Sequence, residues 1–177
     1  MTVQARNNVK QLIQWDPEKY MNVWVVKSIE NFSDDGNTVL GFAQFPTDLN
    51  SDPETDGIVI RHDYCGSIET ASSNHGRTLT HEAGHWLNLI HIWGDEDCGD
   101  DNVDDTPTAL EPNYNVCDNN GDINGGAYPY HIGTCDMSQG QTITQLSGEM
   151  FMNYMDYSDD FCMNMFSKGQ GQRMRNS

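Results

Sequence analysis

The apolar residues of the first half follow helix-like and strand-like spacings in turn. Residues 3–14 place apolar side chains at roughly helical spacing and Pro17 follows shortly after, so we expect a helix there. Three runs rich in β-branched and aromatic residues predict strands at 20–27, 39–45 and 57–62. We expect the first of these strands to be buried. The polar segment 31–37 predicts a turn.

The helical period returns at 77–88, where apolar residues surround a row of histidines. The order of helix, strands and helix predicts an α/β layer arrangement for the first half. The region 94–148 has almost no regular pattern, and we expect a final helix to begin near Ser167 with Met174 on its inner face. The 177 residues are enough for one domain with a substantial core.

The histidines of the 77–88 segment form a pattern that is typical of metal binding. His81 and His85 are four residues apart, so on a helix their imidazoles share a face, with Glu82 beside them. A catalytic zinc site uses three protein ligands and a water, and His91 is the natural third ligand. The short pattern alone also occurs where such histidines are surface or core residues, and the third histidine favours the zinc site.

The third histidine reaches the same ion only if the helix ends before it. Six residues of unbroken helix would turn His91 away from the face of His85. Glycine is the usual residue in the left-handed conformation that ends a helix, and asparagine is the best tolerated substitute. The sequence therefore predicts a left-handed turn at Asn88.

The net charge of −18 argues against nucleic acid and anionic membranes as partners. No stretch is apolar for long enough to span a bilayer, so we expect no membrane insertion. The first residues lack the apolar region of a signal peptide, and the end of the chain from Gly171 reads like a helix cut short. We therefore expect a catalytic domain trimmed from a longer protein.

Four of the five cysteines follow the histidine motif, in a region rich in Gly, Asp and Asn. Such a region cannot easily be held together by burial, so disulfides and an oxidising compartment are expected. A second metal site is the rival interpretation, but the sequence has no C-x-x-C spacing. Cys65 is left over, either buried and free or paired outside this sequence.

The stretch from Asp95 to Asp105 carries seven carboxylates, which repel one another unless cations intervene. Oxygen ligands in an irregular loop suit calcium, although the spacing is not that of an EF-hand. The candidate calcium ligands are Asp101, Asp104, Asp105 and Thr106. The alternative is a solvated acidic loop without an ion.

These residues, with Met155 downstream, resemble the metzincin metallopeptidases, in which a methionine turn lies beneath the metal. Within that clan the chain is most similar to the pappalysin family. The matching segments are 76–87, 105–107, 153–157 and the region that follows Cys162. Most metzincins carry glycine where Asn88 stands, although the clan pattern admits asparagine.

The resemblance implies a metzincin-type zincin fold of the α/β (α+β) class. A twisted mixed sheet and the active-site helix belong to the N-terminal half, and the C-terminal half is irregular and stapled by disulfides. One catalytic domain is expected over 1–177, with subdomains of about 1–91 and 92–177 and the active-site cleft between them. The family pattern pairs Cys98 with Cys135 and Cys117 with Cys162.

The resemblance also implies peptide-bond hydrolysis. Glu82 would be the general base that takes a proton from a zinc-activated water and passes it to the leaving amine. Tyr157 would donate a hydrogen bond to the tetrahedral oxyanion, its alternative role being that of a packing tyrosine. Met155 would be a structural floor under the histidines and not a ligand.

In the family, substrate lies extended along an edge strand. We expect 39–45 to be that edge because Pro46 blocks further pairing, with Gly41, Phe42 and Ala43 as substrate-binding residues. Phe161 is expected in the pocket wall and favours apolar substrate side chains. The neighbouring acids at 159–160 favour basic ones, but relatives with a basic preference carry an acid where Phe161 stands.

The function expected from the sequence is that of a secreted, extracellular zinc endopeptidase acting on proteins or peptides. Zinc is the expected catalytic cofactor, calcium the expected structural ion, and a monomer is favoured. A non-catalytic zinc- or calcium-binding adhesion or recognition module of the same fold is the first alternative. A zinc hydrolase acting on other substrates is the second.

Overall fold

The computed structural model describes residues 8–30, 38–68, 71, 76–118, 120, 122–123, 135 and 148–177. The chain divides into two compact units, Met1–Asn88 and Leu89–Ser177. The predicted turn at 31–37 and the first residues of the predicted helix at 3–14 lie outside the described residues. A single catalytic domain over 1–177 stays a prediction. No helix in the described part is both long and apolar enough to cross a membrane.

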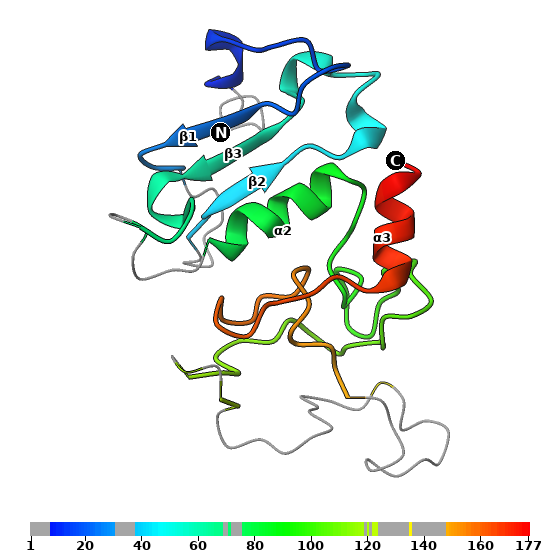
Figure 1. The fold of residues 1–177 in the computed structure, drawn as a ribbon. Helices are drawn as coiled ribbons and strands as arrows, with labels where there is room; N and C mark the ends of the chain where they lie inside the picture. The colour runs from blue at the N-terminus through cyan, green and yellow to red at the C-terminus, as the bar shows by residue number, and fades with distance from the viewer. Residues whose placement is uncertain are drawn as a thin grey trace. The chain divides into compact units, whose positions relative to one another are not determined.

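The first unit contains a mixed three-stranded sheet, drawn in blue to cyan in Figure 1. Its strands are β1 (Val23–Val26), β2 (Gly41–Ala43) and β3 (Ile58–Arg61), in the order β1-β3-β2. β3 is parallel to β1 and antiparallel to β2. Its β-branched residues Ile58, Val59 and Ile60 are all buried, as expected for a central strand. The mixed sheet confirms the α/β class.

The first strand is less buried than its sequence predicted. Val23 is 37% exposed and Val25 is 55% exposed, whereas Trp24 between them is buried. β1 is an edge strand of the described sheet, and only one of its faces is covered, so its residues alternate between buried and exposed. The indole of Trp24 donates a hydrogen bond to the carbonyl of Ile13 at 3.0 Å.

The predicted N-terminal helix is wrong in the part that the structure describes. Only a short 3₁₀ turn forms, η1 (Lys10–Leu12), and the apolar residues expected to face inward, Leu12 and Ile13, are 81% and 65% exposed. Lys10 is buried instead. Its ammonium lies 5.2 Å from the centre of the Phe42 ring and 5.8 Å from that of the Trp24 ring.

Helix α2 (Arg77–Trp86) packs against β2 and β3 and runs beside β2 in Figure 1. The Trp86 indole donates to the Asp56 carboxylate at 2.9 Å and anchors the end of this helix. Asp56 follows the last of the short 3₁₀ turns between β2 and β3, and one more such turn follows β3. These turns are η2 (Pro46–Asp48), η3 (Pro53–Thr55) and η4 (His62–Tyr64).

The described part of the second unit is largely irregular, as the sequence predicted, and ends in helix α3 (Lys168–Arg175). Ser167 and Gln170 form a capping box at the start of α3. Met174 lies on the inner side of α3 and packs against a core of buried residues. That core consists of Leu89, Ile92, Trp93, Ala109 and Met155.

Two disulfides staple the second unit. They join Cys98 to Cys135 and Cys117 to Cys162, with Cα–Cα distances of 5.5 and 5.9 Å, and match the pairing that the family pattern implies. Each closes a loop of the irregular region, which gains stability because its unfolded ensemble is restricted. Cys65, in the first unit, is free and half-buried.

Candidate metal centre

Helix α2 presents two histidines from consecutive turns. The Nε2 atoms of His81 and His85 lie 3.1 Å apart, and their rings meet edge to face with centroids 4.7 Å apart. Both side chains are buried, and the ring of Phe45 packs against His85 at 5.3 Å. Two ring nitrogens that face one common point in this way form one side of a metal site.

Helix α2 ends where the motif requires it to end. The N–H of Leu87 donates to the carbonyls of Ala83 and Gly84, and the N–H of Asn88 donates to the carbonyl of His85 at 2.9 Å. Asn88 has φ of 71°, in the left-handed region. This confirms the turn predicted at Asn88, and it releases the following residues from the helical path before His91.

The turn at Asn88 brings the third histidine to the other two along one continuous stretch of chain. The ligand nitrogens of His81, His85 and His91 all lie within 4.8 Å of one another. Three neutral imidazoles, buried or nearly so, fit the ligand preference of zinc. Within the described ranges, no other group of three His, Cys, Asp or Glu side chains converges in this way.

Glu82 lies beside His81 on the same helix and is only 6% exposed. Burial raises the pKa of its carboxyl from the usual 4.5 to about 8. A β-carbon built on Gly41 of β2 would stand 3.0 Å from Cγ of Glu82 and 3.2 Å from its Oε1. Gly41 therefore packs directly on the carboxyl arm of Glu82, a contact that the sequence did not reveal.

Tyr157 and Met155 lie beside the third ligand within the second unit. The ring of Tyr157 meets the His91 ring edge to face at 4.8 Å, and Tyr157 is 42% exposed. Met155 is fully buried, and its carbonyl accepts the N–H of Ile92 at 3.3 Å. Met155 thus supports the segment that carries His91, in keeping with a structural role.

Two further neighbours of His91 were missed from the sequence. The Trp93 ring stacks on the His91 ring, with centroids 4.2 Å apart and planes inclined by 6°. The Asp95 carboxylate pairs with Nδ1 of His91. Trp93 could have been predicted as a neighbour, since it stands two residues after the third histidine. Asp95 could not, because nothing distinguished it from the other acids of the stretch.

The four candidate calcium ligands lie in one loop of the second unit. Asp101 is buried, which raises the pKa of its carboxyl, and it accepts hydrogen bonds from the Thr106 hydroxyl and from the Val103 N–H at 3.0 Å. Asp104 is exposed. Of the four candidates, Asp101 and Thr106 are thus joined by a hydrogen bond, and calcium binding stays a prediction.

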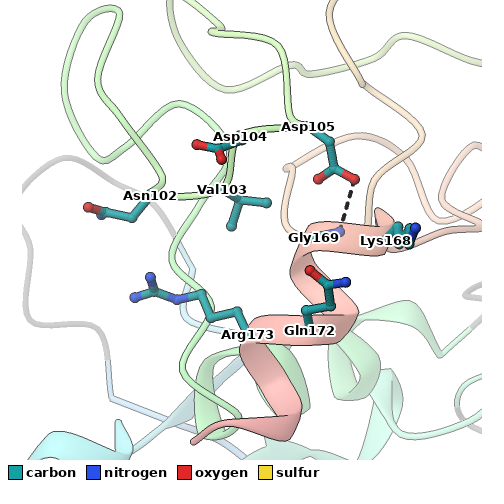
Figure 2. Close-up of a pocket in the computed structure, with 8 residues that line it drawn as sticks. All are labelled: Asn102, Val103, Asp104, Asp105, Lys168, Gly169, Gln172 and Arg173. Atoms are coloured by element: carbon teal, nitrogen blue, oxygen red, sulfur yellow. Dashed lines mark hydrogen bonds between the residues drawn. The ribbon is translucent and has the colours of Figure 1, made fainter.

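Asp105 also holds the start of α3. Its carboxylate accepts the Ser167 hydroxyl at 2.6 Å. It also accepts the Gly169 N–H at 2.9 Å, as Figure 2 shows. These hydrogen bonds lower the pKa of Asp105. A cleft of about 390 Å³ opens beside this contact, with Lys168 and Arg173 of α3 among the residues that line it.

The predicted substrate-binding residues belong to both units. Gly41, Phe42 and Ala43 form β2, which is the antiparallel edge strand of the described sheet, and all three are half-buried. Phe161 is half-buried in the turn that precedes Cys162. Their contact with substrate stays a prediction.

Comparison with known proteins identifies the group to which this site belongs. The profile of the pregnancy-associated plasma protein-A peptidase family matches residues 4–177. Extracellular metalloproteases of Colletotrichum graminicola and Verticillium alfalfae are 34% and 37% identical over 144 and 142 residues, in each case 78% of this chain and 45% of the relative. This chain therefore spans about half the length of these relatives.

A solved structure supports the same family assignment. Mature mirolysin of Tannerella forsythia, in complex with a cleaved peptide, is 38% identical and superimposes with a TM-score of 0.71, covering 99% of this chain and 59% of mirolysin. This likeness confirms the metzincin fold, and the family profile covers nearly the whole chain. The chain belongs to the pappalysin family of metallopeptidases, the family of pregnancy-associated plasma protein-A.

Proposed function

We propose that this chain is the catalytic part of an extracellular zinc endopeptidase that hydrolyses peptide bonds in proteins. The observation that carries the proposal is the convergence of His81, His85 and His91 beside the buried carboxyl of Glu82. The names of the relatives, extracellular metalloproteases, support the reaction and the compartment. The two disulfides fit an oxidising compartment.

The three histidines would hold zinc through their ring nitrogens. When bound, zinc supplies Lewis acidity that activates a water and polarises the scissile carbonyl. Glu82 takes the proton of the attacking water and delivers it to the leaving amine. Its place beside His81 on α2 and its burial suit that task, because they hold the carboxyl next to the metal site.

Tyr157 provides a hydrogen-bond donor in this mechanism. Its ring rests against His91 and Trp93 at 4.8 Å from each, while the side chain remains 42% exposed. A phenol that is held at its ring and accessible to solvent can present its hydroxyl to a substrate. We assign it to the oxyanion that develops on the scissile carbonyl.

Substrate lies extended along β2 in this proposal. β2 has a neighbour on one side only within the described sheet, so its other side offers backbone groups to a peptide strand. Phe161 contributes an apolar wall to the pocket for the substrate side chain that follows the scissile bond. The protein acts on proteins or peptides and works as a monomer.

Glu82→Gln tests the mechanism. The variant should keep its fold and its zinc content, because glutamine has the same shape, and should lose cleavage of casein by about a hundredfold to ten-thousandfold. Glu54→Gln, which changes an exposed acid of η3, is the control and should cleave at the wild-type rate. Wild-type cleavage by Glu82→Gln would overturn the assigned base.

A peptide library analysed by mass spectrometry, with and without chelator, tests the reaction class. Chelator-sensitive cuts before apolar residues are expected. Zinc binding without any cleavage would replace the endopeptidase with the non-catalytic module of the same fold. Cleavage confined to basic residues would overturn the pocket assigned to Phe161.

A further inference from the structure

The third histidine is held by more than its place in the motif. Its Nδ1 pairs with the Asp95 carboxylate, one face of its ring stacks on Trp93, and Tyr157 meets its edge. The His91 side chain is 14% exposed, whereas that of Asp95 is 54% exposed. Asp95 therefore lies at the rim of the site and directs its carboxylate inward to the ring.

A tight turn brings Asp95 to that position. The N–H of Gly94 donates to the carbonyl of His91 at 2.9 Å, and Gly94 and Asp95 both have left-handed backbones, with φ of 67° and 61°. A β-carbon at Gly94 would collide with the backbone of Gly99 and Asp100, so only glycine fits there. Asp95 adopts the left-handed conformation although it has a side chain, which is uncommon for residues other than glycine.

The contact determines which nitrogen of His91 is available. A carboxylate accepts hydrogen bonds and cannot donate them, so Nδ1 of the neutral ring must carry the proton. The lone pair then lies on Nε2, the same atom type through which His81 and His85 face each other. Stacking on Trp93 restricts rotation of the ring about its long axis, and the hydrogen bond restricts the remaining freedom.

We propose that Asp95 is a positioning residue for the metal centre: it fixes the tautomer and the orientation of His91 and so strengthens zinc binding. The inference rests on the proposed zinc site and adds to it a residue outside the histidine motif. Carboxylates that orient metal-binding histidines typically contribute tenfold to a hundredfold in metal affinity. Asp95 belongs to the acidic stretch but was not among the four predicted calcium ligands, so this role does not compete with calcium binding.

Zinc affinity measured by competition with a chromophoric chelator tests the proposal without any substrate. Asp95→Asn should weaken zinc binding by about tenfold to a hundredfold. Asparagine tolerates the left-handed backbone, so the turn is preserved. Asp97→Asn removes the same charge from an exposed residue two positions further on and should bind zinc as the wild type does. Equal affinities in all three proteins would overturn the proposal.

Asp95→Gly provides a second variant, since glycine adopts the left-handed backbone without strain and removes the carboxylate completely. It should weaken zinc binding at least as much as Asp95→Asn. Long-range ¹H–¹⁵N spectra of the metal-free protein give an independent readout. The wild type should show His91 protonated on Nδ1, and both Asp95 variants should show a mixture of tautomers. A wild type protonated on Nε2 would overturn the assignment.

The two proposals fail in different ways. If the wild type binds zinc but cleaves nothing, the endopeptidase proposal fails. The role of Asp95 is then decided only by the zinc affinities of the wild type and its variants. If Asp95→Asn binds zinc as tightly as the wild type while Glu82→Gln is inactive, the role of Asp95 fails and the peptidase remains.

Discussion

Gly41 on β2 lies so close to Glu82 on α2 that a β-carbon at position 41 would stand 3.0 Å from Cγ of Glu82. It would also stand 3.2 Å from the Val59 carbonyl oxygen, so the backbone of β3 closes the other side. The backbone of Gly41 is not in the left-handed region, and alanine suits its conformation. The need for glycine at this position is therefore steric and comes from Glu82 on one side and from the Val59 carbonyl on the other.

We expect Gly41→Ala to displace the Glu82 carboxyl by a few tenths of an ångström and to lower kcat by up to about tenfold, because misplacement by a full ångström costs about a hundredfold. KM should change less, since the backbone of β2 is retained. Kinetics on a fluorogenic peptide, with zinc content determined in parallel, measure the effect. An unchanged kcat in a zinc-loaded variant would contradict this steric role.

Gly171→Ala is the matched control for that substitution. A β-carbon there meets only the Arg175 guanidinium, at 3.8 Å, which is an ordinary contact. Because Gly171 lies inside α3, alanine should stabilise the protein by about 0.5–1 kcal/mol. Its kcat should equal that of the wild type.

A buried carboxyl in the second unit should make stability depend on pH. Asp156 is fully buried, and burial raises the pKa of its carboxyl from 3.8 to about 7, although the N–H groups of Asn113 and Tyr157 donate to it. Between these two values the native state keeps a proton that the unfolded state has released. The contribution of Asp156 to stability therefore falls as pH rises through this window, by at most about 1.4 kcal/mol per pH unit.

Asp156→Asn removes this titration. The buried Oδ1 of Asn113 has no hydrogen-bond partner among the residues that the structure describes, so the Asn113 amide can turn over and accept from the new amide. We expect the difference in unfolding free energy between variant and wild type to grow in favour of the variant from about pH 4 to pH 7. Denaturant unfolding across this range measures it. A difference that does not change with pH would contradict the raised pKa.

Features that depend on a few consecutive residues were predictable from the sequence. The left-handed turn at Asn88 is a property of one residue at a helix end, and it was correct. The start of α3 at Ser167 follows from its capping box, which is also local. The strands at 39–45 and 57–62 were found because β-branched and aromatic runs mark them, with boundaries shortened by one to two residues at each end.

Features that depend on distant residues were not predictable. The contact of Gly41 with Glu82 requires the register of β2 on β3, which pairs Gly41 with Ile60, and the packing of α2 across both strands. The pairing of Asp95 with His91 was missed for another reason. It spans only four residues, but the stretch carries seven carboxylates and the sequence did not indicate which of them pairs with His91. Lys10 faces inward because its ammonium donates to the carbonyls of Thr55 and Gly57. These partners lie 45 and 47 residues further along the chain, so the local pattern did not reveal its burial.

Lys10 should produce a pH dependence of the opposite sign. Its ammonium donates to the carbonyls of Thr55 and Gly57, and burial lowers its pKa from 10.5 to about 8. Between these values the unfolded state binds a proton that the native state lacks, so the stability of the wild type rises with pH. Below the lower value the contribution is constant.

Lys10→Met keeps the aliphatic stem and removes the titration. On a Cys65→Ser background, which prevents thiol exchange in alkali, we expect the wild-type lysine to gain stability relative to methionine from about pH 8 to pH 10. Denaturant unfolding of both proteins measures the gain. Parallel pH profiles would show that the ammonium of Lys10 keeps an ordinary pKa in the folded protein.

Calcium should stabilise the acidic loop of the second unit if the predicted ligands bind it. The carboxyl of Asp101 is buried, and a cation beside it would offset the desolvation that raises its pKa. Calcium added to metal-stripped, zinc-reloaded protein should raise Tm by a few degrees, and magnesium at the same concentration should not. Asp101→Asn should abolish the increase, while Asp97→Asn should retain it. If calcium raises Tm no more than magnesium does, the loop has no specific calcium site, and the hydrogen bonds of Asp101 and Asp105 are what hold it.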